Sequence, residues 1–477
     1  MDICNTGGLA GALPTFNGGV RSFVEGPKSY RFGKPPAKAG SIEVQNYTHF
    51  LEITLKTVGC WDWFEKPRKE CEIFINNIYL SLVLFVLINL LISLLVNLYI
   101  EWIDIMSSLD KMADGLPLIA SVLIVSYFAT NKDDLYDLVG FMNNNFKWRS
   151  ARGLTNMTMV KSYRTAKNFA FFYTACTLFS VTMYVFMPVV LHLWTNQSLQ
   201  PWIYTEVTRT PLIILIFLRQ CLAQAFVALA LGQLGVFFAC NAILLCGQLD
   251  LLCCCLRNVR YTAVLEGGVQ HSALLSQYSA IEDDEKHNYL YNTTEMVDSK
   301  YHYDNKRRNY IGMKTEFDIY SSEYDDATND ALRECARICQ VINEYKDRFE
   351  KFVSPLLVLR VVQVTLYLCT LLYAATLKFD MITVEYLGAV ALDIYIYCYF
   401  GNQIILQADR VTTAAYQSAW PTMGVKPRRL LLNILLSNLK PVIVRAGRFL
   451  PMNLHTFVVI IKTSFSYYTL LVNVNEK

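Results

Sequence analysis

Seven stretches of the chain are apolar over a length that suits a membrane-crossing helix. The hydrocarbon core of a bilayer is about 30 Å thick and needs about 20 apolar residues in a helix. The second stretch is short, and the fourth is long enough for two spans. Hydrophobic residues make up 53% of the chain and charged residues only 17%, against about 25% charged residues in soluble domains. The pattern therefore predicts an all-α membrane protein with spans at 73–100, 115–130, 169–193, 212–256, 352–377, 381–406 and 453–474.

Basic residues alternate between rich and poor segments along these spans. With 212–256 as one helix, the N-terminal tail and the six connecting segments contain 9, 1, 7, 1, 13, 1 and 7 Lys and Arg residues. Basic residues accumulate on the cytoplasmic side of a membrane. Splitting 212–256 would place the richest segment outside, and this stretch has no Pro or polar cluster that would make a turn. We therefore expect seven transmembrane helices with a cytoplasmic N-terminus and an extracellular C-terminus.

Two of the predicted spans continue on the cytoplasmic side. The inner part of 212–256 would expose a large apolar patch unless protein covered it. In 331–352, which leads into the fifth span, apolar residues recur every three or four positions and charges fill the other face, as in an amphipathic helix. We expect these two helix extensions to pack together and form a cytoplasmic anchor. Residues 258–330, which are rich in acidic residues and Tyr, predict a partly disordered loop.

Two further amphipathic stretches flank the bundle. Residues 48–64 predict an interfacial helix before the first span, and 428–439 are amphipathic but too short to cross a membrane. The chain then divides into six parts: a cytoplasmic tail with the interfacial helix (1–72), helices one to four (73–256), a cytoplasmic loop and anchor helix (257–351), helices five and six (352–406), a cytoplasmic anchor segment (407–452) and the last helix (453–477).

The sequence contains no motif for catalysis, for a metal or for a cofactor. The 6 His residues are scattered and give no ligand-spaced cluster, and neither a phosphate-binding loop nor a GxSxG nucleophile motif is present. A net charge of +3 gives no indication of nucleic-acid binding. All 14 Cys lie in spans or on the inner side, so we expect no structural disulfide. The run Cys253–Cys255 is either palmitoylated or, more commonly, buried at a helix end.

Four Asn-x-Ser/Thr sequons occur, at Asn46, Asn156, Asn196 and Asn292. The predicted topology places only Asn196 outside, so this is the one residue that we expect to carry a glycan.

Five ionisable residues lie within the predicted spans: Arg219, Arg360, Glu385, Asp393 and Lys462. Such residues are costly in a membrane and usually face protein or water. We expect Arg219, Arg360 and Glu385 to form buried structural pairs or to extend to the interface. Asp393 lies well inside the sixth span, and we expect it to pack there with its carboxylate hydrogen-bonded.

The last span carries a polar face. Thr463, Ser466, Thr469 or Leu470, and Asn473 recur at three- and four-residue intervals and so share one side of a helix. This face is either the wall of a water-filled pore with a hydrophobic constriction or a surface for helix packing through Ser and Thr. The spacing favours neither alternative.

Three blocks in about the last quarter of the chain resemble the insect odorant receptors. The first runs from Ala446 to Leu471 and contains the Gly-Arg-Phe and Lys-Thr-Ser-Phe-Ser-Tyr motifs. The second runs from Tyr397 to Gln403, where Cys398 is followed by Gly401 and Asn402. The third, from Ala414 to Trp420, reads Ala-Ala-Tyr-Gln-Ser-Ala-Trp. Upstream of these blocks the likeness is architectural.

The resemblance implies an odorant-gated, non-selective cation channel of four subunits in the membrane of sensory neurons. The subunits would be four copies of this chain or a mixture with a co-receptor. Each last helix would line the pore for permeant cations, with Ser466 and Asn473 facing it and Leu470 as the hydrophobic gate. The family binds small apolar volatile ligands in the outer half of helices two, three, four and six, which by position indicates Met183, Tyr184, Met187, Ile213, Phe217 and Tyr386.

Other seven-span classes fit less well. The gustatory receptors share the fold and the topology, but they end in a Thr-Tyr…Gln-Phe motif that is absent here; a ligand-gated channel of that type is the alternative function. A G-protein-coupled receptor would have its N-terminus outside, which the charge alternation excludes. A secondary transporter would show internal repeats.

Overall fold

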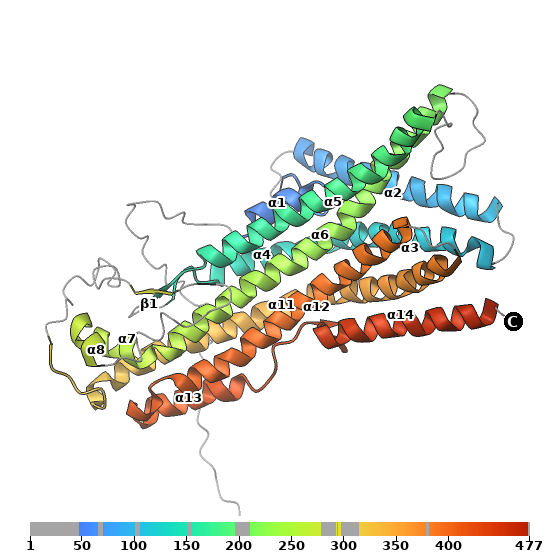
Figure 1. The fold of residues 1–477 in the computed structure, drawn as a ribbon. Helices are drawn as coiled ribbons and strands as arrows, with labels where there is room; N and C mark the ends of the chain where they lie inside the picture. The colour runs from blue at the N-terminus through green and yellow to red at the C-terminus, as the bar shows by residue number, and fades with distance from the viewer. Residues whose placement is uncertain are drawn as a thin grey trace, which may run out of the picture. The chain divides into compact units, whose positions relative to one another are not determined.

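Long helices make up most of the described chain (Figure 1). The computed structural model describes residues 47–64, 70–100, 105–150, 155–195, 210–277, 292, 294–296, 314–377 and 381–475. The helices are α1 (His49–Lys56), α2 (Glu70–Ile100), α3 (Ile105–Thr130), α4 (Lys132–Asn145), α5 (Val160–Thr195), α6 (Thr210–Arg257), α7 (Val259–Glu266), α8 (His271–Gln277), α11 (Asp325–Leu377), α12 (Met381–Gln417), α13 (Val425–Ser437) and α14 (Leu454–Asn475), with 3₁₀ turns η2 (Ser322–Tyr324) and η3 (Trp420–Thr422).

Each of the seven predicted spans corresponds to a single helix: α2, α3, α5, α6, α11, α12 and α14, the last of which begins one residue after the predicted start at 453. Among the described residues, α2, α6, α11 and α12 each contain a stretch long and apolar enough to cross a membrane. The pair α3 and α4, bent by 69° at Asn131, gives a fifth candidate if the two are taken together. The short second stretch is part of a longer helix than expected, because α3 begins at Ile105 and contains Pro117 without ending there.

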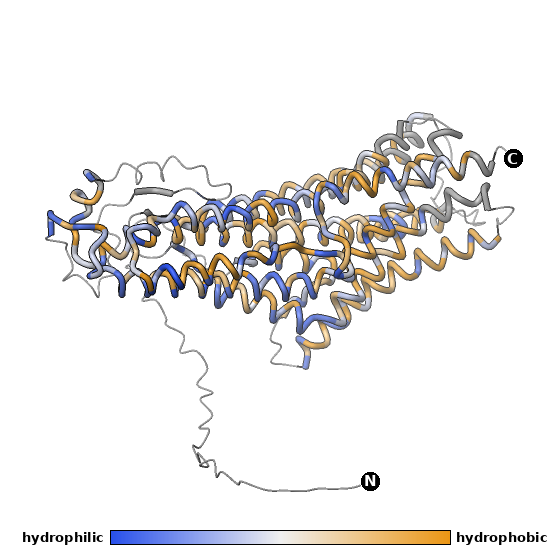
Figure 2. Tube along the Cα trace, turned by 90° about the horizontal axis from the view of Figure 1, so that it is seen from below, coloured by the Kyte–Doolittle hydropathy of each residue, from blue (hydrophilic) through white to orange (hydrophobic). Residues whose placement is uncertain are grey.

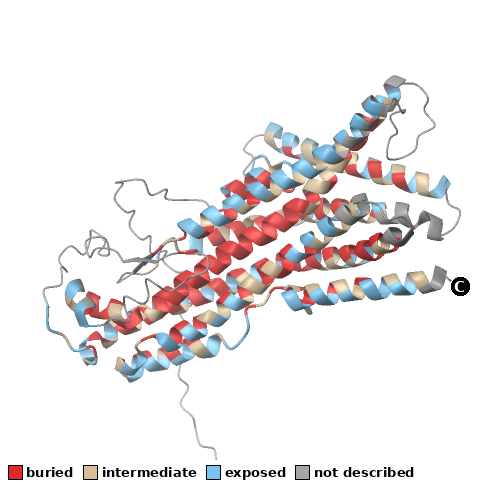
Figure 3. Ribbon diagram, viewed as in Figure 1, coloured by how far each residue is buried: buried red, intermediate tan, exposed pale blue. Residues whose placement is uncertain are grey.

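The fourth predicted span is one uninterrupted helix, as expected. α6 has 48 residues and α11 has 53, so at 1.5 Å per residue they extend about 72 and 80 Å, more than twice the thickness of the hydrocarbon core. Polar residues are more frequent towards the end of the bundle that carries α7 and α8, and apolar residues towards the C-terminal end of α14 (Figure 2). The inner half of α6 is buried on every side (Figure 3).

The predicted stripe of α11 supplies the cover for α6. Phe238 of α6 and Phe349 of α11 have ring centroids 5.5 Å apart, and Phe237 meets Phe352 at 5.7 Å. Apolar burial of this kind contributes roughly 25 cal/mol per Å². The eight stripe residues are all buried: Leu332, Cys335, Ile338, Cys339, Ile342, Tyr345, Phe349 and Phe352. The expected packing of the two helix extensions is confirmed.

The stretch predicted as an interfacial helix packs partly against the rest of the protein. The helix is short, at His49–Lys56, and its apolar residues Phe50, Leu51 and Leu55 are buried. Phe50 lies against Tyr163 of α5, with ring centroids 5.5 Å apart, and α1 also contacts α6. Protein covers these three residues, whereas Ile53, Trp63 and Phe64 of the predicted stretch are exposed. The helix is therefore shorter than the expected 48–64, and its interfacial position stays a prediction.

The segment expected to be a loop contains local structure. α7 and α8 follow α6 directly, and β2 (Thr294–Met296) pairs antiparallel with β1 (Thr155–Met157). Apolar residues of α7, α8 and the segment before α11 form a small separate core: Ala263, Val264, Leu265, Val269, Leu274, Ile319 and Tyr324. Residues 278–291 and 297–313 lie outside the described residues. The expected loop therefore contains helices, a strand and a small core in its described part, whereas the expectation of partial disorder concerns residues outside that part and stays a prediction.

Candidate pore helix and ligand-binding region

α14 packs on the bundle through one face. Ile460 and Ser464 are buried, and the Ser464 hydroxyl lies 3.3 Å from the carbonyl oxygen of Thr365 on α11, as well as 2.9 Å from that of Ile460. Near the start of α14, the ring of Phe457 meets Tyr395 of α12 edge-on at 5.5 Å. The helix is therefore held by both α11 and α12.

The predicted pore residues lie on the opposite face of α14. Ser466 and Leu470 are exposed, with 59% of Leu470 accessible, and the exposed face is visible in Figure 3. Their positions are about 200° and 240° around the helix from Ser464, at 100° per residue. Asn473 belongs to the same helix, but its side chain lies outside the described residues. One of the two alternatives for the polar face was helix packing through Ser and Thr. Within this chain, Ser464 makes that packing contact.

The hydroxyls on the exposed side of α14 are satisfied by their own helix. Ser466 donates to the carbonyl oxygen of Lys462 at 3.0 Å, and Thr463 donates to that of Val459 at 2.8 Å. A hydroxyl that donates inward keeps acceptor lone pairs for other partners. This face can therefore accept hydrogen bonds from water or contact hydrated cations.

The segment that leads into α14 touches α12 backbone to backbone. A Cβ added to Gly401 would lie 2.1 Å from the carbonyl oxygen of Met452, so no larger residue fits there. The turn between β3 (Arg445–Ala446) and β4 (Leu450–Pro451) has positive φ angles at Gly447 and Arg448. Gly447 donates its backbone N–H to the carbonyl oxygen of Ser354 on α11 at 3.3 Å. The glycines of the C-terminal motifs thus fix the start of α14.

The predicted ligand-binding residues differ in their surroundings. Phe217 of α6 is buried and Ile213 is half-buried, whereas Met183 of α5 is 56% exposed. The side chains of Tyr184 and Met187 lie outside the described residues. Tyr386 of α12 is half-buried and belongs to a separate small apolar cluster.

This outer cluster consists of Tyr367 and Leu371 of α11 packed with Leu116 of α3 and Tyr386, Leu387 and Val390 of α12. The sequence analysis missed the α11 residues because it considered helices two, three, four and six only. Tyr367 and Leu371 are one helical turn apart, and this spacing could have indicated that they share one face of α11. A hollow of about 470 Å³ lies elsewhere, on the polar face of α11, and its charged lining (Glu344, Asp347, Arg348, Lys351) does not suit an apolar ligand.

Two of the intramembrane charges form the expected structural pair. Arg360 of α11 and Asp393 of α12 are joined by an ion pair, with side chains 4% and 12% exposed. Tyr173 of α5 donates to Asp393 at 3.5 Å. Arg219 instead donates to the side-chain oxygen of Asn89 on α2. Glu385 has no described side chain.

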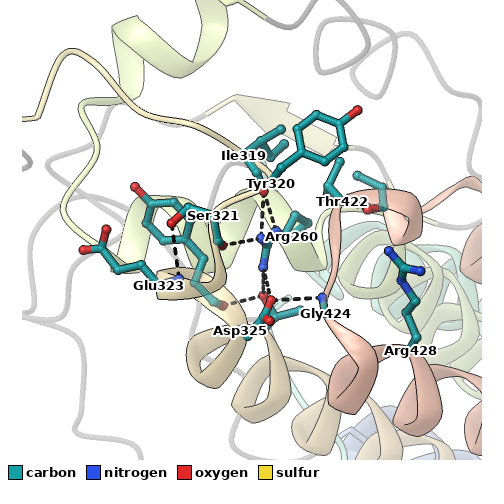
Figure 4. A network of polar contacts seen from close by, with 12 residues as sticks. Arg260, Ile319, Tyr320, Ser321, Glu323, Asp325, Thr422, Gly424 and Arg428 are labelled. Carbon is teal, nitrogen blue, oxygen red and sulfur yellow. Dashed lines mark hydrogen bonds and ion pairs between the residues drawn. The ribbon is translucent and has the colours of Figure 1, made fainter.

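A buried arginine joins three elements at the end of the bundle that carries α7 (Figure 4). The Arg260 guanidinium of α7 donates to the carbonyl oxygen of Ile319 at 2.7 Å and to Asp325 Oδ1, at the start of α11, at 3.0 Å. The same carboxylate oxygen accepts the backbone N–H of Gly424, just before α13, at 3.1 Å. Burial lowers the pKa of Arg260, and the hydrogen bond with Asp325 opposes this shift. We call this group the Arg260 clamp; the sequence analysis did not find it.

The cysteine run is buried at the inner end of α6. Cys253, Cys254 and Cys255 are all buried, which favours the packing interpretation over palmitoylation. The described residues contain no group of His, Cys, Asp and Glu side chains suited to a metal ion. A hydrogen bond with Cys255 and burial raise the pKa of Cys335 well above its usual value, so this thiol is protonated at neutral pH.

The long apolar helices are those of a helical membrane protein, and comparison with known proteins places the chain more narrowly. The family model described as 7tm Odorant receptor matches residues 118–465. Odorant receptor 83a of Drosophila melanogaster is 23% identical over 71% of this chain and 73% of its own length. Odorant receptor 94a of the same organism is 37% identical over 19% of this chain and 24% of its own length.

Solved structures agree with the fold. The structure of the insect olfactory receptor OR5 from Machilis hrabei in complex with eugenol has a TM-score of 0.61 at 14% identity, covering 90% of this chain and 99% of that one. The chain belongs to the 7tm odorant receptor family, a family of receptors and not of enzymes.

Proposed function

We propose that this chain is a subunit of an odorant-gated, non-selective cation channel, in which α14 lines a central pore among four subunits. One observation carries the proposal: α14 packs through Ser464 on α11, while Ser466 and Leu470 lie exposed on the opposite face. A face of hydroxyls ending in a leucine suits a wet pore with a hydrophobic constriction. Ser466 and Asn473 would contact permeant cations, and Leu470 would close the pore.

The ligand that we propose is a small, uncharged, apolar volatile molecule. Ile213, Phe217 and Tyr386, together with Met183, Tyr184 and Met187 of α5, would line its site in the outer half of the membrane. A site built from aromatic and Met side chains binds through shape and contact and adapts to several ligands. We further propose a cytoplasmic N-terminus, a glycan on Asn196, and assembly as four copies or with a co-receptor in sensory neurons.

Thiol accessibility on α14 tests the pore assignment. Cells expressing Ser466→Cys or Leu470→Cys, alone or with a family co-receptor, are opened with a panel of uncharged volatile phenols, esters and alcohols that includes eugenol. A charged methanethiosulfonate reagent should then block the current. Ser464→Cys is the matched control, because its side chain packs on α11. If the reagent left the current of all three variants unchanged, α14 would be excluded as the pore helix.

A further inference from the structure

The buried ion pair and the outer cluster are two contacts of the same two helices. α11 and α12 run antiparallel (Figure 1). Arg360 faces Asp393, and Tyr367, seven residues towards the outer end of α11, shares the outer cluster with Tyr386, seven residues towards the outer end of α12. Seven residues are about two helical turns, or about 10.5 Å. The charges and the aromatic rings therefore form two levels of one contact, with the proposed ligand-binding residue Tyr386 at the outer level.

Four helices enclose the ion pair. Tyr173 of α5 donates to Asp393, and Arg360 donates also to Gln363 one turn further along α11. On α6, a Cβ added to Gly235 would lie 3.9 Å from Asp393. Buried charges are expensive, and apolar residues of similar size would usually stabilise such a contact as well or better. An ion pair with hydrogen bonds is directional, however, and holds one register of two helices where apolar side chains could slide.

α11 contacts the proposed pore helix between these two levels. Thr365, which contacts Ser464 of α14, lies between Arg360 and Tyr367. Because α11 and α14 run in the same direction (Figure 1), the residue six positions beyond Ser464 lies about level with the residue six positions beyond Thr365. These residues are Leu470 and Leu371. The proposed gate is therefore level with the outer cluster.

We propose that Arg360 and Asp393 are positioning residues for gating. They hold α12 in register with α11, so that a ligand which displaces Tyr386 moves α11 and, through Thr365 and Ser464, the helix that carries Leu470. This inference rests on the proposed function. It assigns the pair a role in coupling the ligand to the pore, beyond a contribution to the stability of the bundle.

The test separates coupling from assembly by using a variant with a leaking gate. In the Leu470→Ala background, current without ligand reports an assembled pore. Adding Asp393→Asn should leave this current intact. In protein that keeps Leu470, Asp393→Asn should raise the ligand concentration needed for half-maximal current about tenfold or more, which is within the usual range of coupling. Exchanging the charges, with Arg360→Asp and Asp393→Arg together, should restore most of the response. Asp134→Asn, which breaks the exposed pair of Asp134 with Lys351 on α11, is the matched control and should change neither current.

A second variant keeps the test decisive if a lone buried charge prevents folding. Arg360→Met with Asp393→Leu leaves no charge unpaired, so it should reach the cell surface and leak in the Leu470→Ala background. We expect its response to the panel to be weakened as in Asp393→Asn. A full response from this apolar pair would overturn the inference, because it would show that packing alone is sufficient. If wild-type protein gives no evoked current and Leu470→Ala gives no leak, the proposed function itself fails.

Discussion

The hydroxyl of Tyr345 on α11 donates a hydrogen bond of 2.5 Å to the side-chain oxygen of Asn241 on α6. Both residues are fully buried, and burial raises the pKa of Tyr345, so the hydroxyl stays protonated and able to donate. The side-chain amide nitrogen of Asn241 donates a hydrogen bond to the carbonyl oxygen of Phe237. This buried polar contact helps to fix the register of the two long helices within a largely apolar interface.

Tyr345→Phe should lower the stability of the protein. The change leaves the Asn241 oxygen buried without this donor, which costs about 1 to 3 kcal/mol. Thermal unfolding of the protein in detergent, followed by intrinsic fluorescence, measures the loss. Tyr416→Phe is the matched control, because Tyr416 is exposed. Equal melting temperatures for the two variants would contradict the packing of α6 on α11.

The Arg260 clamp should be essential to the end of the bundle that carries α7. Arg260→Ala removes the partner of Asp325 and of two backbone carbonyls, and breaking such a buried pair costs about 3 to 5 kcal/mol. Limited proteolysis in detergent should then cleave the variant faster than the wild type. Gly424→Ala should act similarly, because its Cβ would lie 2.0 Å from Asp325. If Arg260→Ala and Asp325→Ala had fully additive effects in a double-mutant cycle, the two residues would not be coupled.

Much of the helical framework could be predicted from the sequence because periodicity reports which face of a helix is buried. The stripe from Leu332 to Phe352 is an example. Periodicity does not report what covers that face, so the packing of α1 on α5 could not be predicted. The Arg260 clamp joins positions 59 to 99 residues apart in pairs, in a polar region where neither periodicity nor a motif gives a signal. Tyr367 was missed for a related reason: only the register of α11 against α12 brings it to Tyr386.

Glycosylation should report the topology. We expect one glycan, on Asn196, so Asn196→Gln should abolish the mobility shift produced by deglycosylation. Asn292 is buried: its side-chain oxygen accepts the hydroxyl of Ser162 at 2.7 Å and its amide donates to Gly247 at 3.0 Å. A glycan has no room there. A glycan that persists in Asn196→Gln and maps to Asn292 would contradict both the orientation and this packing.

Substitution in the outer cluster should change ligand preference without opening the pore. Tyr386→Ala removes an aromatic ring from the proposed ligand site, and a loss of about 1 to 3 kcal/mol would raise half-maximal concentrations about 5- to 150-fold. Dose–response curves for the volatile panel measure the change. Tyr416→Ala, which removes an exposed ring from the same helix, is the control. A potency ranking unchanged by Tyr386→Ala, in protein that reaches the cell surface, would place the ligand elsewhere.

The central claim, that α14 forms a ligand-gated cation pore closed by Leu470, is tested most directly by whole-cell current. Cells that express the chain, alone or with a family co-receptor, are recorded with and without the volatile panel, and Leu470→Ala is recorded beside the wild type. The account predicts a cation current evoked by the panel in the wild type and a standing current without ligand in Leu470→Ala. Surface-expressed protein that gives neither current, under both conditions of expression, would contradict it.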